Sequence, residues 1–345
     1  MNNMCLKPIR LFDDDKGGGI RCLQCCRRCL IATGNTGFCG TVYNDKGTLY
    51  TLIYGLVASS AVDPIEKKPV YHYKPGSECF SVGSLGCNFR CKFCQNWQIS
   101  YSKPSKNDHE ELRYMSPEAF VRYAIRSKCS GVAWTYNEPS IWAEYTIDCA
   151  KLCKESGLYT VYVTNGYATT EHLDAIGPYL DVYRVDIKSL SSEFYRKLAG
   201  AADVDSILNG TIHIKQKWNA HVECVTNVIP GWNDSDNDLK GIATWIVDNL
   251  GSNTPWHVTR FFPNAQMQNV PITPESTIIN AINIEKETGI KYVYAGNINL
   301  PDGGNTYCPK CGNLCIERKG YYTNILSLNN NGCCPNDNEA LNVIL

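Results

Sequence analysis

The sequence lacks several features that would place it in other classes of protein. It has no apolar run approaching the roughly eighteen residues of a membrane-spanning helix. Its first residues, MNNMCLKPIRLFDDDKGGG, contain no apolar core of an export signal. The formal net charge is only −1, so bulk charge gives no reason to expect a nucleic acid or a membrane surface as a partner. We therefore expect a soluble, cytoplasmic protein that binds neither.

Cysteine, by contrast, is abundant, with 19 residues in a chain of 345. Without an export signal, disulfides do not explain this number, and clustered cytosolic thiols more often bind metal. The clustered cysteines form three groups: Cys22, Cys25, Cys26, Cys29 and Cys39; Cys87, Cys91 and Cys94; and Cys308, Cys311, Cys315, Cys333 and Cys334. The scattered ones are expected to be small core residues: Cys5, Cys79, Cys129, Cys149, Cys153 and Cys224.

The middle of the chain alternates between strand-like and helix-like stretches. The segments ECFSVGSL, GVAWTY, LYTVYVT, DVYRVDI, HVECVTNVI and WHVTRFF read as strands, and KYVYAGN is a candidate for a seventh. A helix is expected after Ser116, its N-cap, with Pro117 in the first turn. Repeated strand–helix units predict a parallel sheet, here an α/β fold with a partial (β/α)6 barrel of the TIM type.

This fold predicts three parts and a location for the site. We expect an N-terminal Cys-rich metal-binding segment over residues 1–70, the barrel over 71–300, and a zinc-ribbon-like segment over 301–345. In such barrels the functional residues lie at the carboxyl ends of the strands and in the loops that follow.

The segment GCNFRCKFCQNW follows the first expected strand and carries Cys87, Cys91 and Cys94. An iron–sulfur cube bound in full takes four thiolates, so three in one loop leave one iron with an open position. An open position distinguishes a reactive metal site from a structural one. Phe89, Phe93 and Trp97 are interspersed with the cysteines and are expected to shield the cluster from water. The alternative is a structural zinc whose fourth ligand comes from elsewhere in the chain.

The C-x3-C-x2-C pattern after a first barrel strand resembles the radical S-adenosylmethionine (SAM) superfamily. The segments DPIEKKPVYHYKPGS, TYNEPS, VTNG, VDIK, PWHVTRFFP and CPKCG extend the resemblance to the radical SAM member of the AmmeMemoRadiSam group, which is related to the pyruvate formate-lyase activating enzyme. The resemblance implies a [4Fe-4S] cluster whose open iron binds the amino and carboxylate groups of SAM. One electron from the cluster then cleaves SAM to a 5′-deoxyadenosyl radical, which abstracts hydrogen.

The resemblance also implies SAM contacts at the ends of the second and third strands. In TYNEP, Asn137 and Glu138 are expected to hold the SAM ammonium, since both can accept hydrogen bonds. The alternative is a helix-start turn in which Pro139 is the first helical residue. In VTNG, Thr164 and Asn165 are expected near the ribose hydroxyls, and a simple turn is the alternative.

Further candidates lie on the fourth and sixth strands. Asp186 and Lys188 in VDIK share one face of the strand by alternation, and are expected near SAM and substrate. A purely structural ion pair is the alternative. His257 is expected near the SAM adenosine and Arg260 near a carboxylate, although a strand histidine is often only a satisfied core residue.

The two flanking cysteine groups predict further metal sites. Cys22, Cys25, Cys29 and Cys39 suit a structural zinc or an iron–sulfur cluster, with Cys26 as a substitute ligand. At the other end, Cys308, Cys311, Cys334 and Asp337 make a zinc set, and Cys315 or Cys333 could replace a member. A degenerate ribbon without metal is the alternative. We expect neither site to be needed for SAM cleavage, because neither lies in a strand-end loop.

The reaction itself is left open by the sequence. The activating-enzyme relationship implies hydrogen abstraction from a protein or peptide, with flavodoxin or ferredoxin as the electron donor. One alternative is cobalamin-dependent C-methylation of a protein residue, although no recognisable cobalamin-binding domain precedes the barrel. The other is a metal-bearing scaffold without catalysis.

Overall fold

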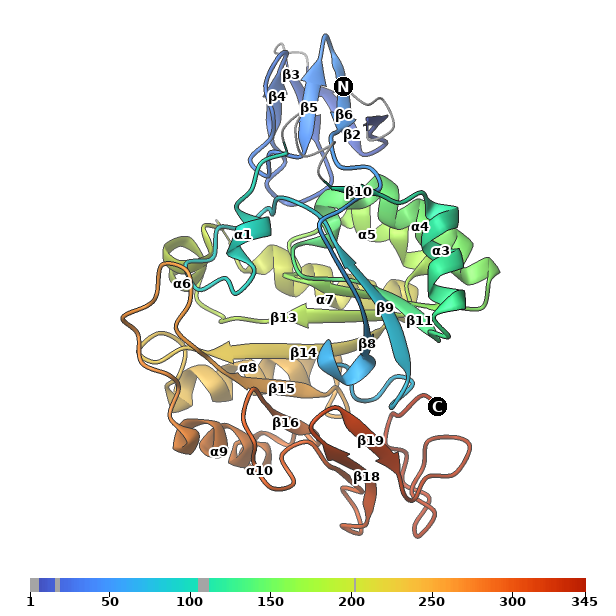
Figure 1. The fold of residues 1–345 in the computed structure, drawn as a ribbon. Coiled ribbons are helices and arrows are strands. Elements are labelled where there is room, and N and C mark those ends of the chain that lie inside the picture. Colours follow the sequence, from blue (N-terminus) through green and yellow to red (C-terminus); the bar gives the residue numbers. More distant parts are fainter. Residues whose placement is uncertain (1–5, 16–18, 105–111, 202) are drawn as a thin grey trace.

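A large, mostly parallel sheet forms the centre of the protein (Figure 1). The computed structural model describes residues 6–15, 19–104, 112–201 and 203–345. Within them the sheet has eight strands in the order β16-β15-β14-β13-β12-β11-β9-β8. The strands from β9 to β16 are parallel, whereas β8 pairs antiparallel with β9. Their bounds are β8 Ser59–Pro64, β9 Glu78–Gly83, β11 Gly131–Trp134, β12 Tyr159–Thr164, β13 Val182–Asp186, β14 His221–Val228, β15 Trp256–Arg260 and β16 Val293–Gly296. The predicted α/β fold and the seventh parallel strand are confirmed.

Helical connections join each parallel strand to the next and pack around the outside of the sheet (Figure 1). The main helices are α3 Pro117–Arg126, α4 Ala143–Glu155, α5 Thr170–Ile176, α7 Asp205–Trp218, α8 Asp236–Leu250 and α9 Glu275–Asn283. The short ones are η2 Ile65–Lys67, α1 Trp97–Ser100, η3 Pro139–Trp142, η4 Gly177–Tyr179, α6 Ser192–Phe194, η5 Tyr195–Ala199 and α10 Glu285–Thr288. As predicted, the Ser116 hydroxyl caps α3 by accepting from the Ala119 N–H at 3.2 Å.

The C-terminal segment contacts both edges of the open sheet (Figure 1, lower part). It contains an antiparallel sheet of β17 Thr306–Tyr307, β18 Leu314–Lys319 and β19 Tyr322–Ile325. Its Arg318 guanidinium donates to the backbone oxygen of Tyr71, which follows β8, at 2.7 Å. Its buried Ile316 belongs to the same apolar cluster as Tyr294 of β16. The segment therefore packs against β16 at one edge and against the connection from β8 to β9.

The N-terminal segment forms a small unit of its own at the top of Figure 1. One sheet consists of β1 Lys7–Pro8, β5 Val42–Asp45 and β6 Thr48–Thr51, and another of β2 Phe12–Asp15, β3 Gly19–Cys22 and β4 Leu30–Ala32. A separate two-stranded sheet pairs β7 Leu56–Val57 with β10 Arg113–Tyr114. The strand β8, which lies within the expected N-terminal segment of residues 1–70, pairs with β9 of the central sheet, and the boundary at residue 70 stays a prediction.

The scattered cysteines are buried, which confirms their expected role as core residues. Cys79, Cys149, Cys153 and Cys224 have no measurable exposure, and Cys129 is 6% exposed. Cys5 lies outside the described residues. No helix in the described ranges combines the length and apolar character needed to cross a membrane.

Candidate active site

The carboxyl ends of the parallel strands open into one cavity of about 1150 Å³. Its strand-end residues are Thr135, Thr164, Asp186, Asn227 and Thr259. Sites for small molecules usually measure about 300–1,000 Å³. The cavity therefore has room for a cofactor together with part of a second molecule.

Cys87, Cys91 and Cys94 all line this cavity, in the loop that follows β9. The loop is anchored to η5. The N–H groups of Arg90 and Lys92 donate to the backbone oxygens of residues 199 and 198, both at 2.8 Å. Burial raises the pKa of the Cys91 thiol to about 12, although the nearby Lys188 ammonium lowers it. A metal bound here would therefore have to displace a thiol proton.

The spacing of these thiols fits a cluster of several irons. The three sulfurs, all within the described residues, do not lie mutually within 4.8 Å. Thiolates on one zinc, each about 2.3 Å from the ion, would lie roughly 4 Å apart. In an iron–sulfur cube each thiolate binds a different iron, so the ligands are further apart. Cys87, Cys91 and Cys94 would thus hold a cluster of several irons at the wall of the cavity.

Two of the three aromatic residues that are expected to shield a cluster from water lie in the cavity wall. Phe89 and Phe93 line the cavity and are 2% and 6% exposed. Trp97, however, begins α1 and is 41% exposed. Trp97 does not line the cavity, so its expected shielding role stays a prediction.

Asn137 lines the cavity but its side chain is engaged with the cysteine loop. Its Nδ2 donates to the backbone oxygen of Gly86 at 2.9 Å, and its Oδ1 accepts from the N–H of Ser84 at 3.2 Å. This pair of bonds joins the turn after β11 to the loop after β9. A contact between Asn137 and SAM stays a prediction.

Glu138 is fully buried and does not line the cavity. Its Oε1 accepts from the N–H of Ser140 at 3.0 Å and from the Thr164 hydroxyl at 2.8 Å, and its Oε2 accepts from the Asn165 N–H at 2.8 Å. Burial raises the pKa of this carboxyl, and the hydrogen bonds oppose the rise. Glu138 therefore positions the end of β12, and its contact with the SAM ammonium stays a prediction.

Thr164 and Asn165 both line the cavity, as expected for strand-end residues. The Asn165 Nδ2 donates to Asn88 Oδ1 at 2.7 Å and lies 4.0 Å from the sulfur of Cys87. Asn88 was not singled out from the sequence, although it directly follows a cysteine ligand candidate. Together the two amides hold the end of β12 against the cysteine loop.

A group of charged side chains from β13 forms part of the cavity wall. Arg184, Asp186 and Lys188 alternate along the strand and its extension, and all three line the cavity. The Asp186 carboxylate pairs with Lys188 at 2.6 Å and also with Arg184. The shared face of Asp186 and Lys188 is confirmed. Arg184 was missed by the sequence analysis, although the same alternation places it two residues before Asp186.

His257 and Arg260 do not line the cavity. His257 is 1% exposed and its Nε2 lies 2.7 Å from Oε2 of Glu223, a buried carboxylate that also pairs with His221. Arg260 donates through Nε to the backbone oxygen of Thr273 at 2.7 Å. In this structure both residues are paired with groups of the protein, so their expected contacts with SAM stay predictions.

Comparisons with known proteins agree with this site. The model of the radical SAM superfamily matches residues 81–245, a range that includes the three cavity cysteines. An uncharacterized protein of Methanocaldococcus jannaschii is 41% identical over 317 residues, which are 92% of each chain. The chain belongs to the radical SAM superfamily.

More distant radical SAM relatives are named activating enzymes. The pyruvate formate-lyase-activating enzyme of Clostridium pasteurianum is 28% identical over 48% of this chain and 67% of its own. The indoleacetate decarboxylase activating enzyme of Tractidigestivibacter scatoligenes is 24% identical over 70% of this chain and 78% of its own. A solved radical SAM methyltransferase from Sphaerobacter thermophilus has the same fold, with a TM-score of 0.51, 14% identity and coverage of 85% and 77%.

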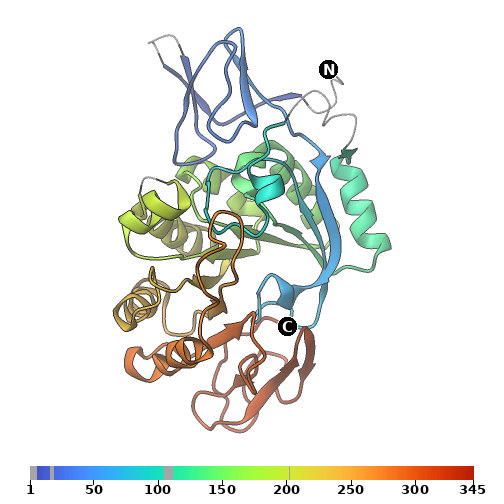
Figure 2. The same cartoon turned by 60° about the vertical axis from the view of Figure 1, so that its left-hand side comes forward.

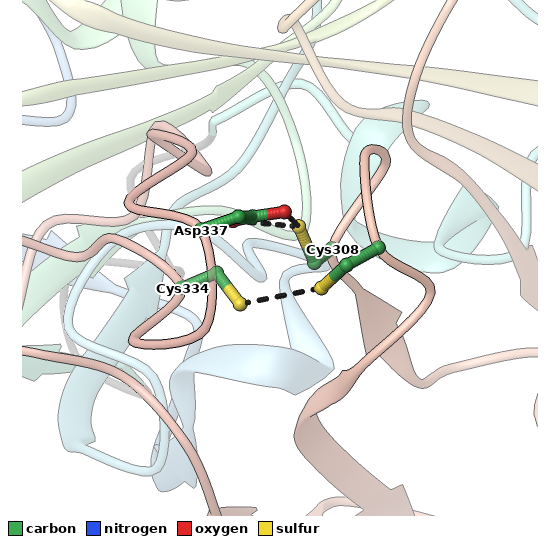
Figure 3. Close-up of side chains that lie close together, drawn as sticks. Cys308, Cys334 and Asp337 are labelled. Atoms are coloured by element: carbon green, nitrogen blue, oxygen red, sulfur yellow. Dashed lines mark hydrogen bonds between the residues drawn. The ribbon is translucent and has the colours of Figure 1, made fainter.

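The C-terminal cysteine group of this radical SAM protein has the geometry of a metal site (Figure 3). The ligand atoms of Cys308, Cys311, Cys334 and Asp337 all lie within 4.8 Å of one another. Cys311 Sγ is 3.6 Å from Cys334 Sγ, and Cys308 Sγ is 3.4 Å from Asp337 Oδ2. These separations fit a single tetrahedral ion. The predicted set is thus brought together, whereas Cys333 instead faces the backbone oxygen of Asn331.

The N-terminal cysteine group surrounds a much smaller cavity of about 10 Å³. Cys22, Cys25, Cys29 and Cys39 all line it. Cys26 does not, because its thiol donates to the backbone oxygen of Ala168 at 3.1 Å. The structure therefore assembles the four predicted cysteines and leaves out the substitute.

Both terminal segments touch the candidate active site. The Arg27 Nε of the N-terminal segment donates to the backbone oxygen of Asn88 in the cysteine loop at 2.5 Å. At the other end, Lys319, Gly320 and Tyr321 of the hairpin β18–β19 line the large cavity. Figure 2 shows the two segments above and below the sheet. The expectation that neither terminal metal site is needed for SAM cleavage stays a prediction.

Proposed function

We propose that this protein cleaves SAM reductively at a [4Fe-4S] cluster held by Cys87, Cys91 and Cys94. The observation that carries the proposal is the position of three thiols from one loop on the wall of a cavity of about 1150 Å³. Such a cluster, when bound with SAM on its open iron, supplies a 5′-deoxyadenosyl radical that abstracts hydrogen.

The residues around the cluster would bind and orient SAM and exclude water. Arg184 and Lys188 share the single carboxylate of Asp186 and could hold an anionic group of the bound molecule. Phe89 and Phe93 cover the cysteine loop with apolar surface. Asn137 and Asn165 fix the neighbouring strand ends to that loop, so the ligand would meet a preorganised wall.

We propose a protein or peptide as the substrate. The relatives named as activating enzymes support this choice, as does the fold shared with SuiB of Streptococcus suis solved with a precursor peptide (TM-score 0.50, 11% identity, 68% and 51% coverage). The hairpin β18–β19 and the loop after β16 contribute to the cavity wall, so part of a larger molecule could enter beside SAM. We propose flavodoxin or ferredoxin as the electron donor and the cytoplasm as the location.

Two finer structural expectations belong to the same proposal. The open sheet, whose inner side chains converge on one cavity, would act as a partial (β/α)6 barrel. Cys308, Cys311, Cys334 and Asp337 would bind zinc, and that ion would order the hairpin at the cavity.

The decisive experiment measures 5′-deoxyadenosine and methionine formed by anaerobically reconstituted protein after reduction with dithionite. We expect both products from the wild type and neither from a variant in which Cys87, Cys91 and Cys94 are replaced by Ala. Cys333→Ala, which removes a thiol outside the cavity and outside the C-terminal ligand group, is the matched control. SAM cleavage by the triple variant would refute the site, and no cleavage by any form would favour the metal-bearing scaffold.

The optical spectrum of the same sample distinguishes the methylation alternative. An iron–sulfur protein without cobalamin gives only the broad cluster absorption. Corrin bands, or a methylated product formed when cobalamin is added, would replace hydrogen abstraction by C-methylation as the reaction of this site.

A further inference from the structure

Four cysteines of the N-terminal unit line a small void beside the cysteine loop. The void measures about 10 Å³, which is close to the volume that one water molecule needs. Thiolates bound to a single zinc, each about 2.3 Å from the ion, leave no such space between them. All four cysteines are described by the structure, and no three of their sulfurs lie mutually within 4.8 Å. The spacing therefore fits a centre of several atoms better than one ion.

Polar groups of the N-terminal unit lie against two of these sulfurs. The Phe38 N–H donates to the sulfur of Cys29 at 3.5 Å, and the sulfur of Cys39 lies 3.1 Å from the Thr41 hydroxyl. In the cysteine loop the N–H of Phe89 likewise donates to the sulfur of Cys87 at 3.4 Å. Hydrogen bonds of this kind stabilise bound thiolates and tune the potential of iron–sulfur centres.

One side chain connects the void to the cysteine loop. Arg27 lines the void, and its Nε donates to the backbone oxygen of Asn88 in the cysteine loop. The Asn88 Oδ1 accepts from Asn165 Nδ2 and lies 3.8 Å from the sulfur of Cys87. The path from the void to the sulfur of Cys87 therefore runs through two adjoining residues, Arg27 and Asn88.

The N-terminal unit packs closely against the cysteine loop on one side and is exposed to solvent on the other. Gly86 has a φ of +81°, and a Cβ at this position would lie 2.8 Å from the backbone oxygen of Cys39. On the outer side, Cys29 is half-buried between Leu30 and Phe38, which are 50% and 39% exposed. The void therefore lies between solvent and the loop that holds the candidate cluster.

We propose that Cys22, Cys25, Cys29 and Cys39 bind a second iron–sulfur centre that relays single electrons to the cluster at Cys87, Cys91 and Cys94. This inference rests on the proposed function, because that cluster is the acceptor. A reduced one-electron donor protein loses the electron, and the second centre gains it and passes it on. The electron finally enters the bond between sulfur and C5′ of SAM, which breaks into methionine and the 5′-deoxyadenosyl radical. The relay centre returns to its starting state.

The metal content of the full-length, anaerobically reconstituted protein tests the second centre. We expect more iron and sulfide than the about four atoms of each that one cube contains. Cys29→Ser should remove the excess and leave the EPR change that SAM produces at the first cluster. Cys26→Ser, whose sulfur lies outside the void, is the matched control and should keep all the iron. Zinc in place of the excess iron, or unchanged iron in Cys29→Ser, would overturn the proposal.

The relay is tested by comparing two reductants. With reduced flavodoxin, formation of 5′-deoxyadenosine by Cys29→Ser should fall several-fold against Cys26→Ser. With dithionite it should change little, because a small reductant can enter the open cavity. If 5′-deoxyadenosine formation by Cys29→Ser fell equally with both reductants, the second centre would be structural. If it fell with neither reductant, the proposed electron relay would be refuted. Failure of the proposed function would look different, since replacing Cys87, Cys91 and Cys94 by Ala would then leave the iron content unchanged.

Discussion

The ammonium of Lys188 lies 2.6 Å from the carboxylate of Asp186 on the wall of the main cavity. The two side chains are 10% and 25% exposed, and Arg184 pairs with the same carboxylate. Two cations therefore share one anion. Although burial opposes ionisation, attraction by Arg184 and Lys188 lowers the pKa of Asp186, so the carboxylate is charged at neutral pH.

Replacing Asp186 by Asn should impair SAM cleavage. The change removes a charge-assisted bond worth about 1.5–3 kcal/mol and leaves two neighbouring cations without their partner. If the lost bond acts in the transition state, the rate of 5′-deoxyadenosine formation should fall about tenfold or more. Asp174→Asn is the control, because Asp174 pairs with His213 and Lys217 and does not line the cavity. A wild-type rate for Asp186→Asn would make this ion pair purely structural.

Replacing Glu138 by Ala should lower stability and SAM affinity together. Three donors, on Ser140, Thr164 and Asn165, would lose their acceptor, at a cost of about 1–3 kcal/mol for each buried group left unpaired. Urea unfolding and SAM titration of the same sample measure the two effects. A loss of SAM affinity with unchanged stability would instead indicate that Glu138 contacts SAM directly.

We expect the C-terminal cysteine group to bind zinc. Zinc binding should require Cys334 but not the adjacent Cys333. Cys334→Ala removes a ligand atom from the set, whereas Cys333→Ala leaves the set intact. Elemental analysis after dialysis should find about one zinc per chain in Cys333→Ala and much less in Cys334→Ala. Asp337→Cys should retain the ion, because thiolate is an equally suitable ligand. Equal zinc contents in the two cysteine variants would exclude this site.

Asp63 should make the stability of the protein depend on pH only in acid. Burial raises the pKa of this carboxyl, but hydrogen bonds from Lys67 and Lys68 outweigh burial and hold it at about 2. Because the pKa of Asp63 is lower in the folded state, its contribution to the free energy of unfolding is complete above the pKa of the unfolded state, about 3.9. This contribution is lost as the pH falls through the pKa of the folded state.

The test for Asp63 compares urea unfolding of the wild type and of Asp63→Asn across this range. The Asp63 and Lys68 side chains are 4% and 3% exposed, so breaking the pair should cost about 3–5 kcal/mol near neutral pH. The difference should stay constant down to about pH 5 and shrink between about pH 4 and pH 2. A difference that grows on acidification would contradict the assignment.

The sequence by itself determined the features that depend on short spacing and periodicity. The alternation of strands and helices, the Ser116 cap, the shared face of Asp186 and Lys188, and the position of the three cysteines after β9 all follow from local pattern. The C-terminal ligand set also followed from spacing within a short segment. Each of these depends on neighbours along the chain.

Only the tertiary structure decided which polar groups face the cavity. Glu138 is occupied by Thr164 and Asn165, and His257 by Glu223, and these partners come from neighbouring strands and the loops that follow them. The contact of Arg27 with Asn88 joins segments that are 61 residues apart in the sequence. Spacing along the chain does not encode such partners, because they are selected by which segments pack together once the sheet has formed.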